Sequence, residues 1–178
     1  MKISPENILC NNNYNFKNIP IYISGNDETY IKGLEDFFLK KFKSSGFGNI
    51  NYLEKSNNYS PSSSLFGEGF VNIVYSPGFV NKDLIKTIIK ANEGLLIVSK
   101  TGPKDKGLKK IFTNSDSYLL IECYKLNKIS KTKFINHFTN TNSIQLEKEV
   151  FWYLLDNLDD RYAFLIKELE KIALSYKK

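Results

Sequence analysis

The chain has 178 residues, 42% of them hydrophobic and 14% aromatic, and it carries a formal net charge of +6. This composition excludes a disordered chain, and the length fits one domain, or one domain with a small appendage. No run approaches the roughly 18 apolar residues that a membrane helix needs, and the start "MKISPENILC" lacks the apolar stretch of a signal peptide, so we expect a cytoplasmic protein without membrane contact.

The residue types that bind metals and form disulfides are scarce. Cys10 and Cys123 are the only cysteines and His137 is the only histidine, so neither a zinc site nor a disulfide framework is expected. The basic charge leaves nucleic-acid binding open. However, the charge comes almost entirely from lysine, with Arg161 as the single arginine, and the Lys/Asn bias is equally typical of an AT-rich genome.

The first two-thirds of the chain alternate between predicted strands and helices. "IPIYIS" (19–24) has the composition of a buried strand, and Asn26 or Asp27 can cap the helix that follows. That helix carries apolar residues at steps of three and four up to "GFG" at 46–48, which ends it. Further strands are expected at 49–53, 70–76, 94–100 and 117–124, with helices at 82–91 and 103–112 between them.

After residue 124 the pattern changes to helices alone, expected at 131–141, 143–158 and 160–178. Strands that alternate with helices predict a parallel α/β sheet with right-handed crossovers. We therefore predict an α/β domain over residues 1–125 and a small helical lid region over 126–178.

The turn after the first predicted strand has the setting of a phosphate-binding loop but not its residues. Such a loop needs G-x-x-x-x-G-K-[ST], whereas this stretch is "GNDETYIKG". Gly25 matches the first position, but Tyr30 and Ile31 stand where glycine and lysine are required. Asp27 and Glu28 would also repel a phosphate. We expect no nucleotide cofactor here, and a structural role for Gly25 in a tight strand-to-helix turn.

Other catalytic patterns are equally weak. His137 lies in a helical pattern without a visible partner, and Cys123 lies in an apolar strand, where a buried and inert thiol is expected. Ser62 to Ser64 lack the G-x-S-x-G frame of a nucleophile elbow. Three aspartates near a helix junction could suggest a metal, but helix capping and solvation explain them better. They are Asp156, Asp159 and Asp160. These observations predict a protein that is not an enzyme by itself.

The stretch "PSSSLFGEGF" (61–70) places two large apolar side chains in a loop rich in serine and glycine. Leu65 and Phe66 either begin the next strand and join the core, or they bind a partner. The residue types alone favour the first possibility, in which Leu65 and Phe66 join the core.

Five stretches in order resemble the delta subunit of bacterial DNA polymerase III, which is part of the clamp loader. They are "IPIYISGNDETYIKGLEDFF", "SLFGEGFVNIVYS", "GLLIVSKTGPKDKGLKKIF", "YLLIECYKLNK" and "DDRYAFLIKELEKIALSY". The resemblance implies an AAA+-like (P-loop-NTPase-like) fold without a functional P-loop, in a subunit without ATPase activity. It also implies binding to the ring-shaped beta-type sliding clamp, contacts with other clamp-loader subunits, and at most weak or indirect contact with DNA.

In that family the Leu-Phe of a Ser-Leu-Phe motif enters a hydrophobic pocket on the clamp. Carried over to this sequence, the motif is Ser64, Leu65 and Phe66. The family also has a third, helical domain that this sequence does not reach, so a fragment and a naturally short relative both fit. Two alternatives stay open: a degenerate AAA+ protein that still binds nucleotide, and a basic DNA-binding module.

Overall fold

We describe the fold from a computed structural model, over residues 1–11, 14, 16, 19–55, 59–61, 68–75, 77–100 and 106–176. Five strands and seven α-helices lie in these residues, with one short 3-10 helix. In chain order they are α1 (Pro5–Leu9), β1 (Ile21–Gly25), α2 (Glu28–Ser44), β2 (Asn49–Tyr52), β3 (Phe70–Val74), η2 (Pro77–Phe79), α3 (Lys82–Lys90), β4 (Gly94–Ser99), α4 (Lys106–Thr113), β5 (Leu119–Cys123), α5 (Lys128–Thr141), α6 (Lys148–Asn157) and α7 (Tyr162–Tyr176).

The five strands form one parallel sheet in the order β2-β3-β4-β1-β5. The three inner strands are rich in isoleucine, leucine and valine and are almost fully buried, as expected for a sheet covered on both faces. The edge strand β2 alternates between half-buried and exposed residues. The expected parallel α/β sheet is therefore confirmed.

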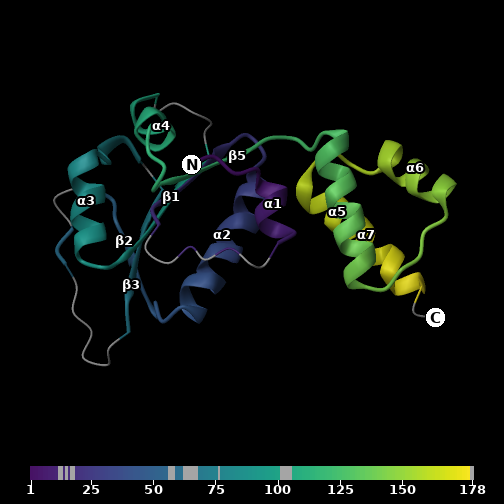
Figure 1. The fold of residues 1–178 in the computed structure, drawn as a ribbon, viewed down its shortest axis with the longest axis horizontal. Helices are drawn as coiled ribbons and strands as arrows, with labels where there is room; N and C mark the ends of the chain where they lie inside the picture. The colour runs from purple at the N-terminus through teal and green to yellow at the C-terminus, as the bar shows by residue number, and fades with distance from the viewer. Residues whose placement is uncertain are drawn as a thin grey trace.

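Helices cover the two faces of the sheet (Figure 1). Helices α3 and α4 lie on one face, and α1 and α2 lie on the other. Each face buries its own apolar cluster, one around Ile85 and Phe112 and the other around Ile31 and Phe38. A side-chain N-cap fixes the start of three helices, at Asp27 for α2, Asn81 for α3 and Asn127 for α5.

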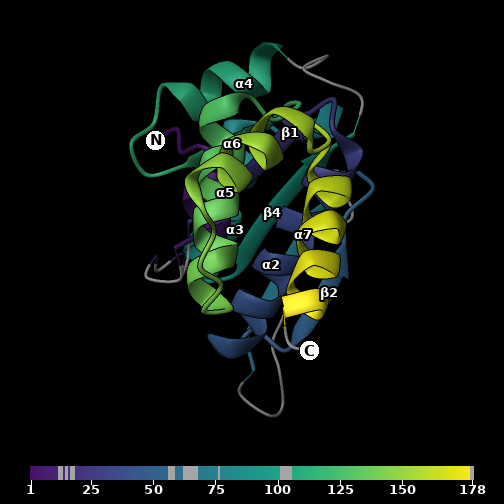
Figure 2. The ribbon, with the colours of Figure 1, turned by 90° about the vertical axis from the view of Figure 1, so that its right-hand side faces the viewer.

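The three C-terminal helices extend the α2 side of the molecule, and they lie nearest the viewer in Figure 2. Helix α7 contacts α2, and α5 contacts α1. Leu165 and Leu169 of α7 belong to the same buried cluster as Ile31 of α2. The predicted boundary at residue 125 falls in the connection from β5 to α5 and stays a prediction.

Helix α1 is absent from the sequence-based expectations, although Ser4 and Pro5 form a common helix start. It is five residues long and buries Ile8, so its apolar periodicity is too short to detect. Among the described residues, no helix is long and apolar enough to cross a membrane.

Candidate functional site

The predicted clamp-binding residues Ser64, Leu65 and Phe66 lie outside the described residues. The structure does describe the point where the chain returns to the sheet. The Gly69 amide donates to the carbonyl of Gly46 at 2.8 Å, and the Asn49 amide donates to the carbonyl of Gly69 at 3.2 Å. Gly69 is thus held at the amino end of β3, beside the start of β2.

Gly69 is required for this close approach. A Cβ atom there would lie 2.6 Å from the ring of Phe47, which is buried and packs edge-on against Phe42. The turn before β2 and the start of β3 therefore pack directly against each other. The start of β3 follows the Ser-Leu-Phe stretch in the chain.

The turn at Gly25 lies at the opposite, carboxyl end of the sheet, where ligands of open parallel sheets usually bind. Gly25 has a φ of 152°, and a Cβ atom there would lie 1.9 Å from the carbonyl oxygen of Cys123. That same oxygen accepts hydrogen bonds from the amides of Asn26 (3.0 Å) and Asp27 (3.3 Å). The predicted structural role of Gly25 in a tight turn is confirmed.

The carboxylate of Asp27 occupies the amino end of α2. One oxygen accepts from the amides of Thr29 (3.0 Å) and Tyr30 (3.1 Å), and also from the Thr29 hydroxyl. The other oxygen accepts from the amide of Tyr162 at the start of α7, at 3.2 Å. The Thr29 hydroxyl in turn accepts from the amide of Ala163 at 3.3 Å. The donors that a phosphate would use at this helix end already bond to the protein's own oxygens.

The aromatic contacts around this carboxylate join the same two helices. Tyr162 stacks on Tyr30 with ring centroids 4.7 Å apart and planes at 10°, and Phe134 of α5 packs against both rings. Burial raises the pKa of Tyr162 to about 12, so this phenol stays neutral at physiological pH. The sequence predicts a helix at 160–178 that contains Tyr162, but no pattern in it predicts the contact between Tyr162 and Tyr30.

The other candidates from the sequence do not converge on a reactive centre. The three aspartates each pair with a different cation: Asp156 with Lys128, Asp159 with Arg161, and Asp160 with the buried Lys131. Hydrogen bonds from Arg161 lower the pKa of Asp159 to about 2. In the part of the chain that the structure describes, no group of three or more acidic, histidine or cysteine residues could hold a metal ion.

The surroundings of His137 and Cys123 do not favour a reactive role for either side chain. His137 is half-buried on α5, and Cys123 is fully buried in β5, where desolvation raises the pKa of its thiol. A high thiol pKa opposes formation of the reactive thiolate.

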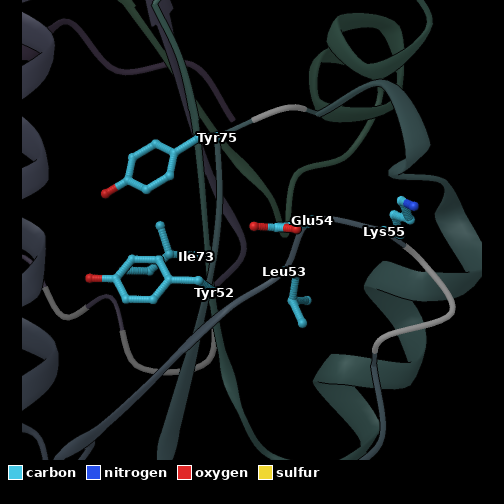
Figure 3. A pocket seen from close by; sticks show the side chains of 6 residues that line it. All are labelled: Tyr52, Leu53, Glu54, Lys55, Ile73 and Tyr75. Carbon is cyan, nitrogen blue, oxygen red and sulfur yellow. The ribbon is translucent and has the colours of Figure 1, made fainter.

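A hollow of about 550 Å³ lies at the carboxyl ends of β2 and β3 (Figure 3). Tyr52 and Tyr75 lie side by side on the face of the sheet that α2 covers, where Ile73 also points, while Leu53 points to the other face. The Tyr75 hydroxyl donates to Glu35 of α2 at 2.6 Å. Sequence reasoning missed this hollow, because only the parallel register brings the two tyrosines together.

Comparison with known proteins gives similarity of fold only. No protein-family model and no curated protein matches this sequence. Among solved structures, a Bacillus subtilis DNA clamp loader delta protein matches 88% of this chain and 53% of its own, at 16% identity and a TM-score of 0.55. The replication initiator DnaA, bound to AMPPCP and single-stranded DNA, matches 90% of this chain and 55% of its own, at 15% identity and a TM-score of 0.45.

The chain therefore spans just over half the length of the structures it matches. The TM-score of 0.55 over 88% of this chain shows a fold shared with the delta protein. The resemblance noted in the sequence is confirmed for the fold: the chain has a P-loop-NTPase-like α/β fold similar to that of a clamp loader delta protein.

Proposed function

We propose that this chain acts in DNA replication as a non-catalytic clamp-loader subunit of the delta type. The observation that carries the proposal is the fold shared with a clamp loader delta protein, together with a Ser-Leu-Phe stretch just before β3. The proposed partners are a sliding clamp and other clamp-loader subunits. The proposed domains are an α/β domain at 1–125 and a helical lid region at 126–178.

The proposed contact with the clamp uses Leu65 and Phe66, supported by Ser64. Two apolar side chains that enter a partner's pocket act as a binding hot spot, worth about 2 kcal/mol or more per residue. The two hydrogen bonds of Gly69 support this role, since a segment held at one end loses less conformational freedom on binding. Ring opening follows if the subunit binds an open clamp interface more tightly than a closed one.

A role without nucleotide is supported by Asp27. Its carboxylate accepts from the amides of Thr29, Tyr30 and Tyr162, so a phosphate at this position would have to displace a buried, hydrogen-bonded anion. Equilibrium binding of labelled ATP tests the nucleotide-binding alternative, and clear magnesium-dependent affinity would establish it.

The experiment that tests the proposal measures binding to the sliding clamp of the same organism by surface plasmon resonance. We expect the double variant Leu65→Ala/Phe66→Ala to lose at least about a hundredfold in affinity, from two hot-spot side chains. Circular dichroism and thermal unfolding must show that the variant stays folded.

A matched control removes two exposed apolar side chains from the C-terminal helices. Ile129 and Leu174 are 68% and 69% exposed on α5 and α7, so Ile129→Ala/Leu174→Ala should bind the clamp like the wild type. Wild-type affinity in the Leu65/Phe66 variant would refute the anchor, and unfolding of that variant would assign the two residues to the core.

A further inference from the structure

The hollow at the end of β2 and β3 presents two aromatic rings that the proposed clamp contact does not use. Tyr52 is 61% exposed and Tyr75 is 42% exposed, although both are large side chains on the face where the neighbouring Ile73 is buried. Their ring centroids are 6.1 Å apart and their planes differ by 17°. Figure 3 shows the rings side by side with their hydroxyl groups directed the same way, so they form one broad aromatic surface.

One of the two rings is held in place before any ligand binds. The Tyr75 hydroxyl donates to a carboxylate oxygen of Glu35, whose side chain is only 3% exposed. The Lys100 ammonium lies 5.6 Å from the centroid of the Tyr75 ring. A ring with a fixed orientation loses little freedom when a second flat group stacks on it.

The charges beside the rings favour a ligand that carries phosphate. Lys100 lies at the Tyr75 ring, whereas Lys55, which also lines the hollow, lies across the strands from both rings in Figure 3. Within the described ranges, neither lysine forms an ion pair with a carboxylate. Glu54 also lines the hollow, so the local positive charge is small, within a chain of net charge +6. Exposed aromatic rings next to lysines are the usual surface for stacking unpaired bases.

We propose that Tyr52 and Tyr75 form a stacking surface for the bases of single-stranded nucleic acid, with Lys100 contacting the phosphate backbone. A duplex keeps its bases stacked inside the helix, so only single strands offer free base faces to the two rings. Because the contacts are ring faces and one lysine, binding is tolerant of sequence and moderate in strength. This site uses other residues than the proposed clamp contact and does not depend on it.

The test is fluorescence anisotropy with a labelled single-stranded oligo-dT, a duplex of equal length and an abasic strand with the same phosphates. We expect the single strand to bind more tightly than both other probes. Tyr52→Ala should weaken single-strand binding by about fivefold or more, the effect of losing one stacked base. Tyr52→Phe, which keeps the ring, should stay within about twofold of the wild type. Lys100→Gln should lower the slope of log affinity against log salt by about one.

The matched control is Tyr153→Ala, which removes another tyrosine, 66% exposed on α6, and should leave binding unchanged. Equal binding of the abasic strand, or equal losses in Tyr52→Ala and Tyr153→Ala, would overturn the proposal. So would capture of a proline-rich peptide by the two rings without any oligonucleotide binding. Tyr52→Ala should keep full clamp affinity and Leu65→Ala/Phe66→Ala full oligonucleotide affinity, which separates failure here from failure of the clamp proposal.

Discussion

At the scale of single residues, the Asp27 carboxylate accepts hydrogen bonds from the starts of two different helices. Its carboxylate caps α2 through the amides of Thr29 and Tyr30 and also reaches the amide of Tyr162 at the start of α7. Both helix ends carry partial positive charge, so one buried anion stabilises the start of α2 and also the start of α7, which lies 135 residues after Asp27 in the chain. The sequence suggests the first of these roles, because Asp is a common N-cap, but it contains no signal for the second.

We predict that Asp27→Ala lowers the free energy of unfolding by about 2–4 kcal/mol. Loss of the cap costs roughly 0.5–2 kcal/mol, and the amide of Tyr162 loses its acceptor at a further cost of roughly 1–3 kcal/mol. Urea denaturation measures the change. Hydrogen exchange should show faster exchange at the amides of Tyr162 and Ala163.

Asn81→Ala is the matched control, because Asn81 caps α3 through the single amide of Leu84. It should cost only about 1 kcal/mol and leave exchange in α7 unchanged. Equal losses in the two variants, or unchanged exchange at Tyr162, would show that Asp27 acts as an ordinary cap.

At the scale of elements, the contact between α2 and α7 depends on a glycine inside a helix. Gly33 lies in the middle of α2, where alanine would normally be preferred, and a Cβ atom there would lie 2.6 Å from the Tyr162 ring. The glycine lets Tyr162 lie flat against α2 and stack on Tyr30. Helix propensity and tertiary packing therefore favour different residues at this position.

We predict that Gly33→Ala destabilises the protein by about 1–3 kcal/mol, the usual cost of overpacking, despite the better helix propensity of alanine. Gly107→Ala in α4 is the control, because no atom lies within 4 Å of its Cβ position. That change should stabilise the protein by about 0.5–1 kcal/mol. Thermal and urea unfolding of both variants measure the difference in sign, and stabilisation by Gly33→Ala would contradict the packing role of Tyr162.

At the scale of the whole molecule, Glu122 joins three distant parts of the chain. Its side chain in β5 is 7% exposed and pairs with Lys2 near the N-terminus and with Lys109 of α4. Burial raises the pKa of the Glu122 carboxyl, but hydrogen bonds from the two lysines outweigh burial, so the pKa lies below its ordinary value. The ionised form is therefore favoured by folding. Its contribution is present at neutral pH and is lost as the pH falls through the range where carboxylates titrate.

We predict that Glu122→Gln lowers the melting temperature at pH 7 by about 2–4 °C, for a loss of about 1 kcal/mol. The estimate is small because Lys2 is 64% exposed, so water screens that pair. The difference from the wild type should shrink as the pH falls and the wild-type carboxyl gains its proton, because the two side chains are then both neutral. Glu170→Gln, at an exposed position on α7, should change little at either pH. A pH-independent difference for Glu122→Gln would exclude its charge as the cause.

Much of the fold could be predicted from the sequence, because local patterns reflect burial. The apolar β-branched runs at 21–25 and 94–99 are central strands, and the three- and four-residue steps in α2 mark the face that is buried. Helix α1 was missed since five residues carry too little periodicity. The candidate clamp residues Leu65 and Phe66 came from the sequence resemblance, and they remain a prediction because they lie outside the described residues.

The sequence by itself determined the parallel α/β class, the failed phosphate-loop motif at Gly25 and the change to helices after β5, since each depends on neighbours along the chain. Only the tertiary structure decided which distant groups meet. It placed the amide of Tyr162 on Asp27 and the ring of Tyr75 beside Tyr52. The physical reason is that strand order and helix packing set these distances, and no local pattern of residues encodes a contact between segments so far apart in the chain.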